Sequence, residues 1–202
     1  MEDRFLHSCS TPNSLGLIVE GDNDKLSYEM IFKRIKPELY IKTLVLHGRD
    51  KKTLKDIFKI LNKKLQGSNH SGVKKGLIIC DCDETCAPER AGFIKEAIKK
   101  ESDLPNTYHK IKIHATCKEL ETLFLTCIED VKIINGQSVN FKQIKNIENI
   151  PDHKKRLSEL LLKEKIIYGN EVAKEIASQI NIETLKERLK NFNRLHQIIN
   201  NL

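Results

Sequence analysis

Short apolar runs alternate with segments of helical period along the first two thirds of this 202-residue chain. Four runs have the length and β-branched content of buried strands: residues 15–19, 41–46, 76–80 and 110–114. Helical spacing of apolar residues marks the segments that follow them: residues 24–36, 53–65, 88–100 and 118–128. The alternation predicts βαβ crossovers, and hence an α/β fold with a mainly parallel four-stranded sheet covered by helices on both faces.

The remainder of the chain has helical periods and no further long strand-like run. A hairpin is expected around Asn135-Gly136, within residues 131–141, because this dipeptide favours tight β-turns. Three helices are expected after it, at residues 152–165, 170–180 and 182–200. We therefore predict a flexible lead at 1–14, an α/β core at 15–141, and a helical extension at 142–202 that packs on the core.

Composition narrows the class of protein without naming a function. Apolar residues make up 39% of the chain and charged residues 31%, as in ordinary globular proteins. No apolar run has the roughly 18–20 residues of a membrane span, and the N-terminus lacks the apolar stretch of a secretory signal, so we expect a cytoplasmic protein. The net charge of +7 favours polyanionic partners but specifies them weakly.

Three of the six cysteines, Cys80, Cys82 and Cys86, stand close together. Their spacing differs from the usual pair of zinc ligands, and no matching Cys/His pair follows. We expect reduced, mostly packed thiols, with zinc as the minor alternative.

Carboxylates follow two of the expected strands: Glu20 to Asp24 after the first, and Asp81 to Glu84 after the third. Because the carboxyl ends of parallel strands meet at one edge of a sheet, both clusters are expected there. Alternation along an extended segment places Asp81 and Asp83 on one side, and Mg²⁺ prefers such oxygen ligands. The alternative is that these acids are turn residues and helix caps, with Asp24 capping the first helix.

Basic and imidazole side chains follow other strands. Arg49 and Lys51 come after the second strand, where they either stabilise a phosphate or are solvated loop charges. His47 and His114 end strands and are more often structural, although His114 at this place can relay a proton. Cations at 154–156 and along 186–194 form either a solvated helix face or a nucleic-acid contact.

Glu20 ending one strand and Asp81-Cys82-Asp83 ending a later one resemble the signature of the Toprim family. That family includes topoisomerases, bacterial primases, recombination-repair proteins and the overcoming-lysogenisation-defect nucleases. The chain is most similar to small stand-alone Toprim proteins of bacteria and mobile elements, with weaker likeness at 47–51, 118–125 and 185–192. It departs from the pattern at 122–124, where the usual aromatic residue is offset, and it has no evident topoisomerase-type tyrosine nucleophile.

The resemblance implies that Glu20 is a metal ligand or general acid/base and that Asp81 and Asp83 are Mg²⁺ ligands, with Mn²⁺ as a substitute. Asp24 and Glu121 match further acidic positions of the family. The expected function is a metal-dependent nuclease, a hydrolase acting on DNA or RNA. The alternative is a non-catalytic metal- or nucleotide-binding module that acts beside a partner ATPase in a phage-defence or mobile-element system.

Other α/β phosphoryl-transfer folds fit the sequence less well. Response-regulator-like proteins carry paired acids after their first strand, and haloacid-dehalogenase-like enzymes carry Asp-x-Asp there. In this chain Asp-x-Asp follows the third expected strand instead.

Overall fold

The fold is known from a computed structural model, which describes residues 14–45, 75–81, 87–100, 111–116 and 120–202. The helix expected at 53–65 lies outside these ranges. None of the described helices is long and apolar enough to cross a bilayer.

A four-stranded parallel sheet forms the centre of the molecule, with strand order β2-β1-β3-β4. Its strands are β1 (Ser14–Val19), β2 (Tyr40–Val45), β3 (Lys75–Asp81) and β4 (Ile111–Thr116). All six residues of β1 are buried, as its apolar sequence predicts for a strand in the middle of a covered sheet. The prediction of an α/β fold with a four-stranded parallel sheet is confirmed. Strand β4 continues two residues beyond its expected end, so His114 lies within the strand.

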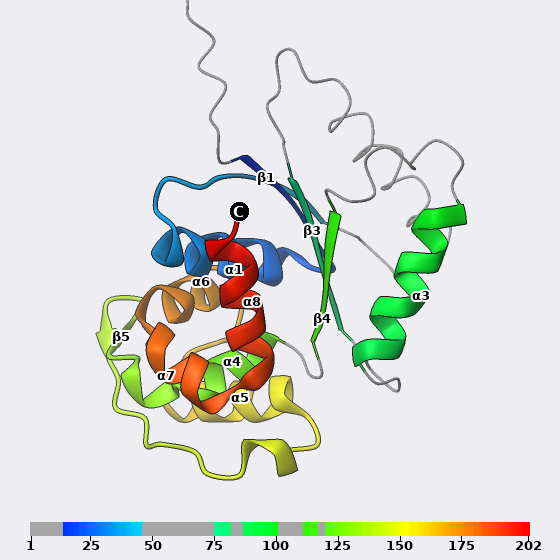
Figure 1. The fold of residues 1–202 in the computed structure, drawn as a ribbon. Coiled ribbons are helices and arrows are strands. Elements are labelled where there is room, and N and C mark those ends of the chain that lie inside the picture. The colour runs from blue at the N-terminus through cyan, green and yellow to red at the C-terminus, as the bar shows by residue number, and fades with distance from the viewer. Residues whose placement is uncertain (1–13, 46–74, 82–86, 101–110, 117–119) are drawn as a thin grey trace, which may run out of the picture.

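Helices cover the sheet on both sides. They are α1 (Asp22–Ile35) after β1, α3 (Ala87–Lys100) after β3, and α4 (Leu120–Thr126) after β4. In Figure 1, α3 lies on one side of the sheet, while α1 and the C-terminal helices lie on the other. The opposite placement follows because the crossovers are right-handed and run in opposite directions, from β1 to β2 through α1 and from β3 to β4 through α3.

Four helices form the C-terminal extension: α5 (His153–Lys163), α6 (Asn170–Gln179), α7 (Ile182–Arg188) and α8 (Lys190–Asn200). The expectation of one continuous helix over 182–200 is wrong, because the chain is extended at Leu189, with φ −124° and ψ 104°. The break lets α7 and α8 pack against each other, which a straight helix does not allow. No glycine or proline marks it, so tertiary packing overrides the helical preference of leucine.

The predicted hairpin is confirmed. Strands β5 (Ile133–Ile134) and β6 (Gln137–Ser138) pair antiparallel. Asn135 and Gly136 join them with φ of 52° and 72°, the positive values that a two-residue type I′ turn needs. Two short 3₁₀ helices flank the hairpin in the chain: η2 (Ile128–Asp130) before it and η3 (Ile147–Asn149) after it.

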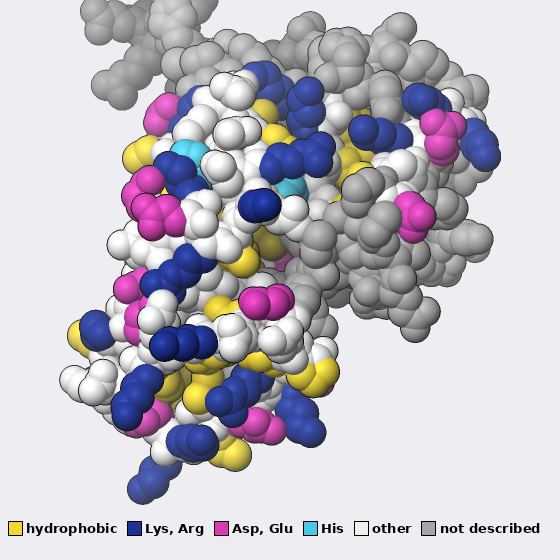
Figure 2. Space-filling view, turned by 60° about the horizontal axis from the view of Figure 1, so that its bottom comes forward, with side chains coloured by type: hydrophobic (Ala, Val, Ile, Leu, Met, Phe, Trp, Pro, Cys, Tyr) yellow, Lys and Arg dark blue, Asp and Glu magenta, His cyan; other side chains and the backbone are white. Residues whose placement is uncertain are grey.

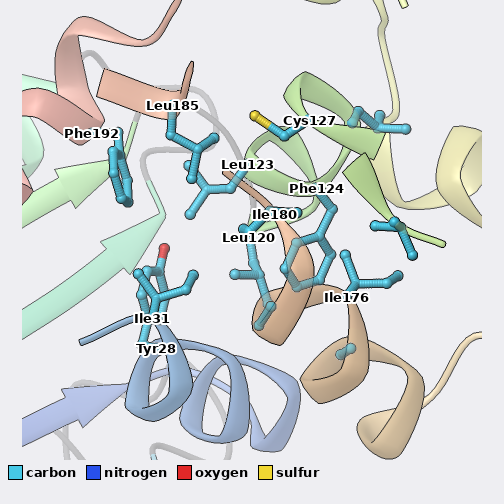
Figure 3. Packing of buried hydrophobic residues seen from close by; sticks show 14 of the residues in the cluster. Tyr28, Ile31, Leu120, Leu123, Phe124, Cys127, Ile176, Ile180, Leu185 and Phe192 are labelled. Carbon is cyan, nitrogen blue, oxygen red and sulfur yellow. The ribbon is translucent and has the colours of Figure 1, made fainter. Parts of the chain in front are cut away.

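One hydrophobic core joins the sheet to the extension. Figure 3 shows Tyr28 of α1, Phe124 of α4, Ile176 of α6 and Phe192 of α8 contributing to it from four elements. Helices α1 and α6 contact each other closely, and their carboxyl ends are joined by a 2.8 Å hydrogen bond from Arg34 Nη1 to the carbonyl of Ala177. The extension is therefore packed on the sheet through α1.

Candidate functional site

The carboxyl ends of β1 and β3 lie side by side at one edge of the sheet. The two strands pair in parallel register up to Ile18 and Ile78. Glu20 follows the last of these pairs by two residues, and Asp81 follows it by three. Adjacent strands are about 4.8 Å apart, so the two main-chain positions are close neighbours at this edge. We call it the acidic edge, and the sequence predicts four acids for it: Glu20, Asp24, Asp81 and Glu121.

The fourth predicted acid, Glu121, comes after β4 in the chain. Thr116, the last residue of β4, pairs with Asp81, and Glu121 follows in the first turn of α4. Glu121 is only 5% exposed, and its Oε1 accepts a 2.9 Å hydrogen bond from the Tyr168 hydroxyl. This contact fixes the carboxylate in place, since a buried carboxylate needs such a partner.

Asp24 acts as a helix cap at the other side of the acidic edge. Its Oδ2 accepts a 2.9 Å hydrogen bond from the backbone N–H of Gly21, the residue that precedes α1. A Cβ at Gly21 would lie 3.3 Å from that oxygen, so the glycine allows the close approach. The capping contact expected as the alternative for Asp24 is thus present, and its role as a metal ligand stays a prediction.

The remaining predicted site residues lie outside the described residues: Asp83, Arg49, Lys51 and His47. Strand β2 ends at Val45 beside Val19, so the segment that holds three of them starts from the same edge of the sheet. Within the described ranges, no three His, Cys, Asp or Glu side chains are grouped as a metal-binding cluster. Cys80 is buried and forms no disulfide, and Cys82 and Cys86 fall outside the described part of the chain.

A cavity of about 430 Å³ lies between β4, α4 and the junction of α7 with α8. We call it the His114 cavity, and its polar lining residues include His114, Thr122, Asn146 and Asn191. His114 is 4% exposed, and burial together with the positive charge of Arg194 lowers the pKa of its imidazole to about 4. The ring is therefore neutral at physiological pH. Sequence analysis missed this cavity, because its walls come from distant segments.

A shallower depression lies beside α5, lined on its basic side by Lys142, Lys145, Arg156 and Lys163. These cations differ from those that the sequence singled out, except for Arg156. Figure 2 shows Lys and Arg side chains scattered over this end of the molecule with Asp and Glu among them. On the face shown in Figure 2, the Lys and Arg side chains do not form a single continuous patch.

Comparisons with protein-family models, with curated proteins and with solved structures give no match. The resemblance to the Toprim family therefore rests on the motifs read from the sequence, and functional inference depends on the fold and the residues themselves.

Proposed function

We propose that this protein is a metal-dependent nuclease whose acidic edge carries out phosphodiester hydrolysis on DNA or RNA. The proposal depends on one observation above all: Glu20 follows β1 and Asp81 ends β3, and these neighbouring parallel strands are in matched register up to Ile18 and Ile78. Acids separated by 61 positions in the chain thereby follow strands that end at one edge, where ligands of open parallel sheets gather. Their donor atoms are carboxylate oxygens, which suit Mg²⁺ or Mn²⁺.

Under this proposal Asp81, Asp83 and Glu20 hold the divalent ion, with Asp24 and Glu121 as further acidic contributors. A bound Mg²⁺ supplies Lewis acidity and lowers the pKa of a bound water. Glu20 is half-buried at the end of β1, where it can accept the proton of the attacking water. Glu121 is oriented by the hydrogen bond that it accepts from Tyr168.

The basic residues supply the affinity for the polymer. The chain carries seven more positive than negative side chains at pH 7, and Lys142, Lys145 and Lys163 line an open depression beside α5. Contacts of lysine with phosphate release counterions and weaken with salt. Binding of nucleic acid should therefore fall steeply as the salt concentration rises. Arg49 and Lys51 are proposed to contact the phosphate at the acidic edge.

The test is cleavage of end-labelled single- and double-stranded DNA and RNA with Mg²⁺, Mn²⁺ or EDTA. Asp81→Asn and Glu20→Gln should each abolish cleavage, whereas Glu96→Gln on the exposed surface of α3 removes the same charge and should leave it intact. Calorimetric titration with Mn²⁺ should show binding to wild type and weaker binding to Asp81→Asn. Equal cleavage by Asp81→Asn and wild type rejects the assignment. Metal binding without cleavage of any polymer favours the non-catalytic module with a partner ATPase instead.

A further inference from the structure

The His114 cavity has the size and wall of a small-molecule site. Its volume of about 430 Å³ falls among ligand sites of roughly 300–1,000 Å³. Tyr28, Leu123 and Phe192 form part of an apolar wall, and they belong to α1, α4 and α8. Figure 3 shows the hydroxyl end of Tyr28 pointing from α1 toward Phe192. A ligand here would be enclosed between the sheet and the helical extension.

Thr122 gives this cavity a hydroxyl group that forms no hydrogen bond. The residue lines the cavity and is only 9% exposed, and its Oγ1 has no hydrogen-bond partner in the structure. The neighbouring Thr126 differs, because its hydroxyl donates to the carbonyl of Thr122 at 2.7 Å. A buried hydroxyl without a partner destabilises the free protein, and a bound ligand with a polar edge removes that penalty. Neutral His114 adds one ring donor and one ring acceptor to the same wall.

Cations outnumber acids around this cavity. Lys190 lines it and is exposed, and Arg194 lies one helical turn further along α8. Arg188 also lines it but is bonded to the carbonyl of Thr126 and to Glu129 Oε1, both at 2.7 Å. Glu148 is the acidic residue in the described lining. An anionic group of a ligand is therefore favoured beside Lys190 and Arg194.

We propose that the His114 cavity binds a nucleotide, with its base against the apolar wall and Thr122 and its phosphate beside Lys190 and Arg194. The choice of a nucleotide rests on the proposed function. Thr122 lines the cavity, and Glu121, a residue predicted for the acidic edge, precedes it in α4. The nucleotide is either free or one unit of a strand that continues to that edge.

The test is calorimetric titration of the full chain in EDTA with AMP, UMP, and four-nucleotide DNA and RNA strands. Thr122→Val keeps the side-chain shape, removes the unpaired hydroxyl, and should weaken binding about tenfold without lowering thermal stability. Lys190→Gln should weaken binding several-fold. Its matched control is Lys186→Gln, which removes an equal charge from a lysine bonded to Glu183 Oε2 at 2.6 Å.

Absence of binding by every nucleotide and strand overturns the inference, as does wild-type affinity in both Thr122→Val and Lys190→Gln. Lys190 is exposed, so its variant keeps the test decisive if Thr122→Val fails to fold. Tighter binding of the strands than of AMP and UMP assigns the cavity to a polymer, and the reverse order assigns it to a free nucleotide. Metal-free nucleotide binding without any metal-dependent cleavage rejects the nuclease and keeps the cavity assignment. Metal-dependent cleavage without nucleotide binding in EDTA keeps the nuclease and rejects the cavity assignment.

Discussion

The Tyr168 hydroxyl donates a 2.9 Å hydrogen bond to Oε1 of the buried Glu121, linking the turn before α6 to the first turn of α4. The two residues lie 47 positions apart in the sequence. Through this contact the C-terminal extension helps to hold one carboxylate of the acidic edge. The extension therefore positions a predicted site residue and contributes to the core.

Tyr168→Phe should lower the free energy of unfolding by about 1–3 kcal/mol, because it leaves a buried carboxylate oxygen without its partner. Urea denaturation followed by circular dichroism measures the change. Tyr40→Phe is the matched control, since Tyr40 is 54% exposed and its hydroxyl can bond to water. Equal stability of the two variants would contradict the structural role of the contact.

Substitutions at Asp24 separate capping from metal binding. Asp24→Ala removes the acceptor for the Gly21 N–H and should cost about 1 kcal/mol of stability. Asp24→Asn keeps an oxygen acceptor and should restore most of that loss. If Asp24 also holds the divalent ion, both variants should weaken Mn²⁺ binding in calorimetry. Wild-type Mn²⁺ affinity in Asp24→Asn would leave Asp24 as a cap alone.

His114 makes stability depend on pH. Its pKa is about 4 in the folded protein against 6.5 as the ordinary value, so the unfolded chain binds the proton first as pH falls. The stability that the neutral ring provides is present above pH 6.5 and is lost progressively down to pH 4. Between pH 7 and pH 5 this loss is about 2 kcal/mol.

The corresponding measurement is urea denaturation of wild type and His114→Gln at both pH values. The variant should lose less stability on acidification, because glutamine does not titrate. His196→Gln serves as the control, since His196 lies on α8 and is partly exposed. The same pH dependence in wild type and His114→Gln would contradict the assignment.

Two glycines with open space around them should respond oppositely to alanine. No atom lies within 4 Å of a Cβ built on Gly136 or on Gly92. Gly136 has φ of +72°, so Gly136→Ala should destabilise the hairpin by about 1 kcal/mol. Gly92 is inside α3, where alanine should stabilise by roughly 0.5–1 kcal/mol. Thermal denaturation of both variants measures the change in stability. Changes in melting temperature of the same sign would contradict the difference in backbone conformation between Gly136 and Gly92.

Much of the fold follows from local sequence pattern. The apolar runs of β1 and β3 predict buried central strands, and Asn135-Gly136 predicts its turn, because these signals act within a few residues. The break at Leu189 has no such signal, since it depends on how α7 and α8 pack. Local sequence pattern therefore predicts the strands and the turn, but it does not predict a helix break that depends on tertiary packing.

The candidate site is predicted less completely. A parallel sheet places Glu20 and Asp81 at one edge by topology alone, so their proximity follows once the strands are recognised. The Tyr168–Glu121 contact and the walls around His114 arise from segments far apart in the chain, and no spacing rule connects them. The unpaired hydroxyl of Thr122 is visible only when its surroundings are known.

The register of the sheet also sets the order in which the molecule can assemble. Leu15 of β1 pairs with Ile41 of β2 on one side and with Lys75 of β3 on the other. The second partner is much farther along the chain than the first. During synthesis, β1 is complete well before β3 emerges from the ribosome, and one flank of an apolar strand stays uncovered in that interval. Such non-local pairing is typical of slow folding, during which aggregation competes with the native state. The central strand β1, which Glu20 follows, thus leaves the nascent chain prone to aggregation until β3 has paired with it.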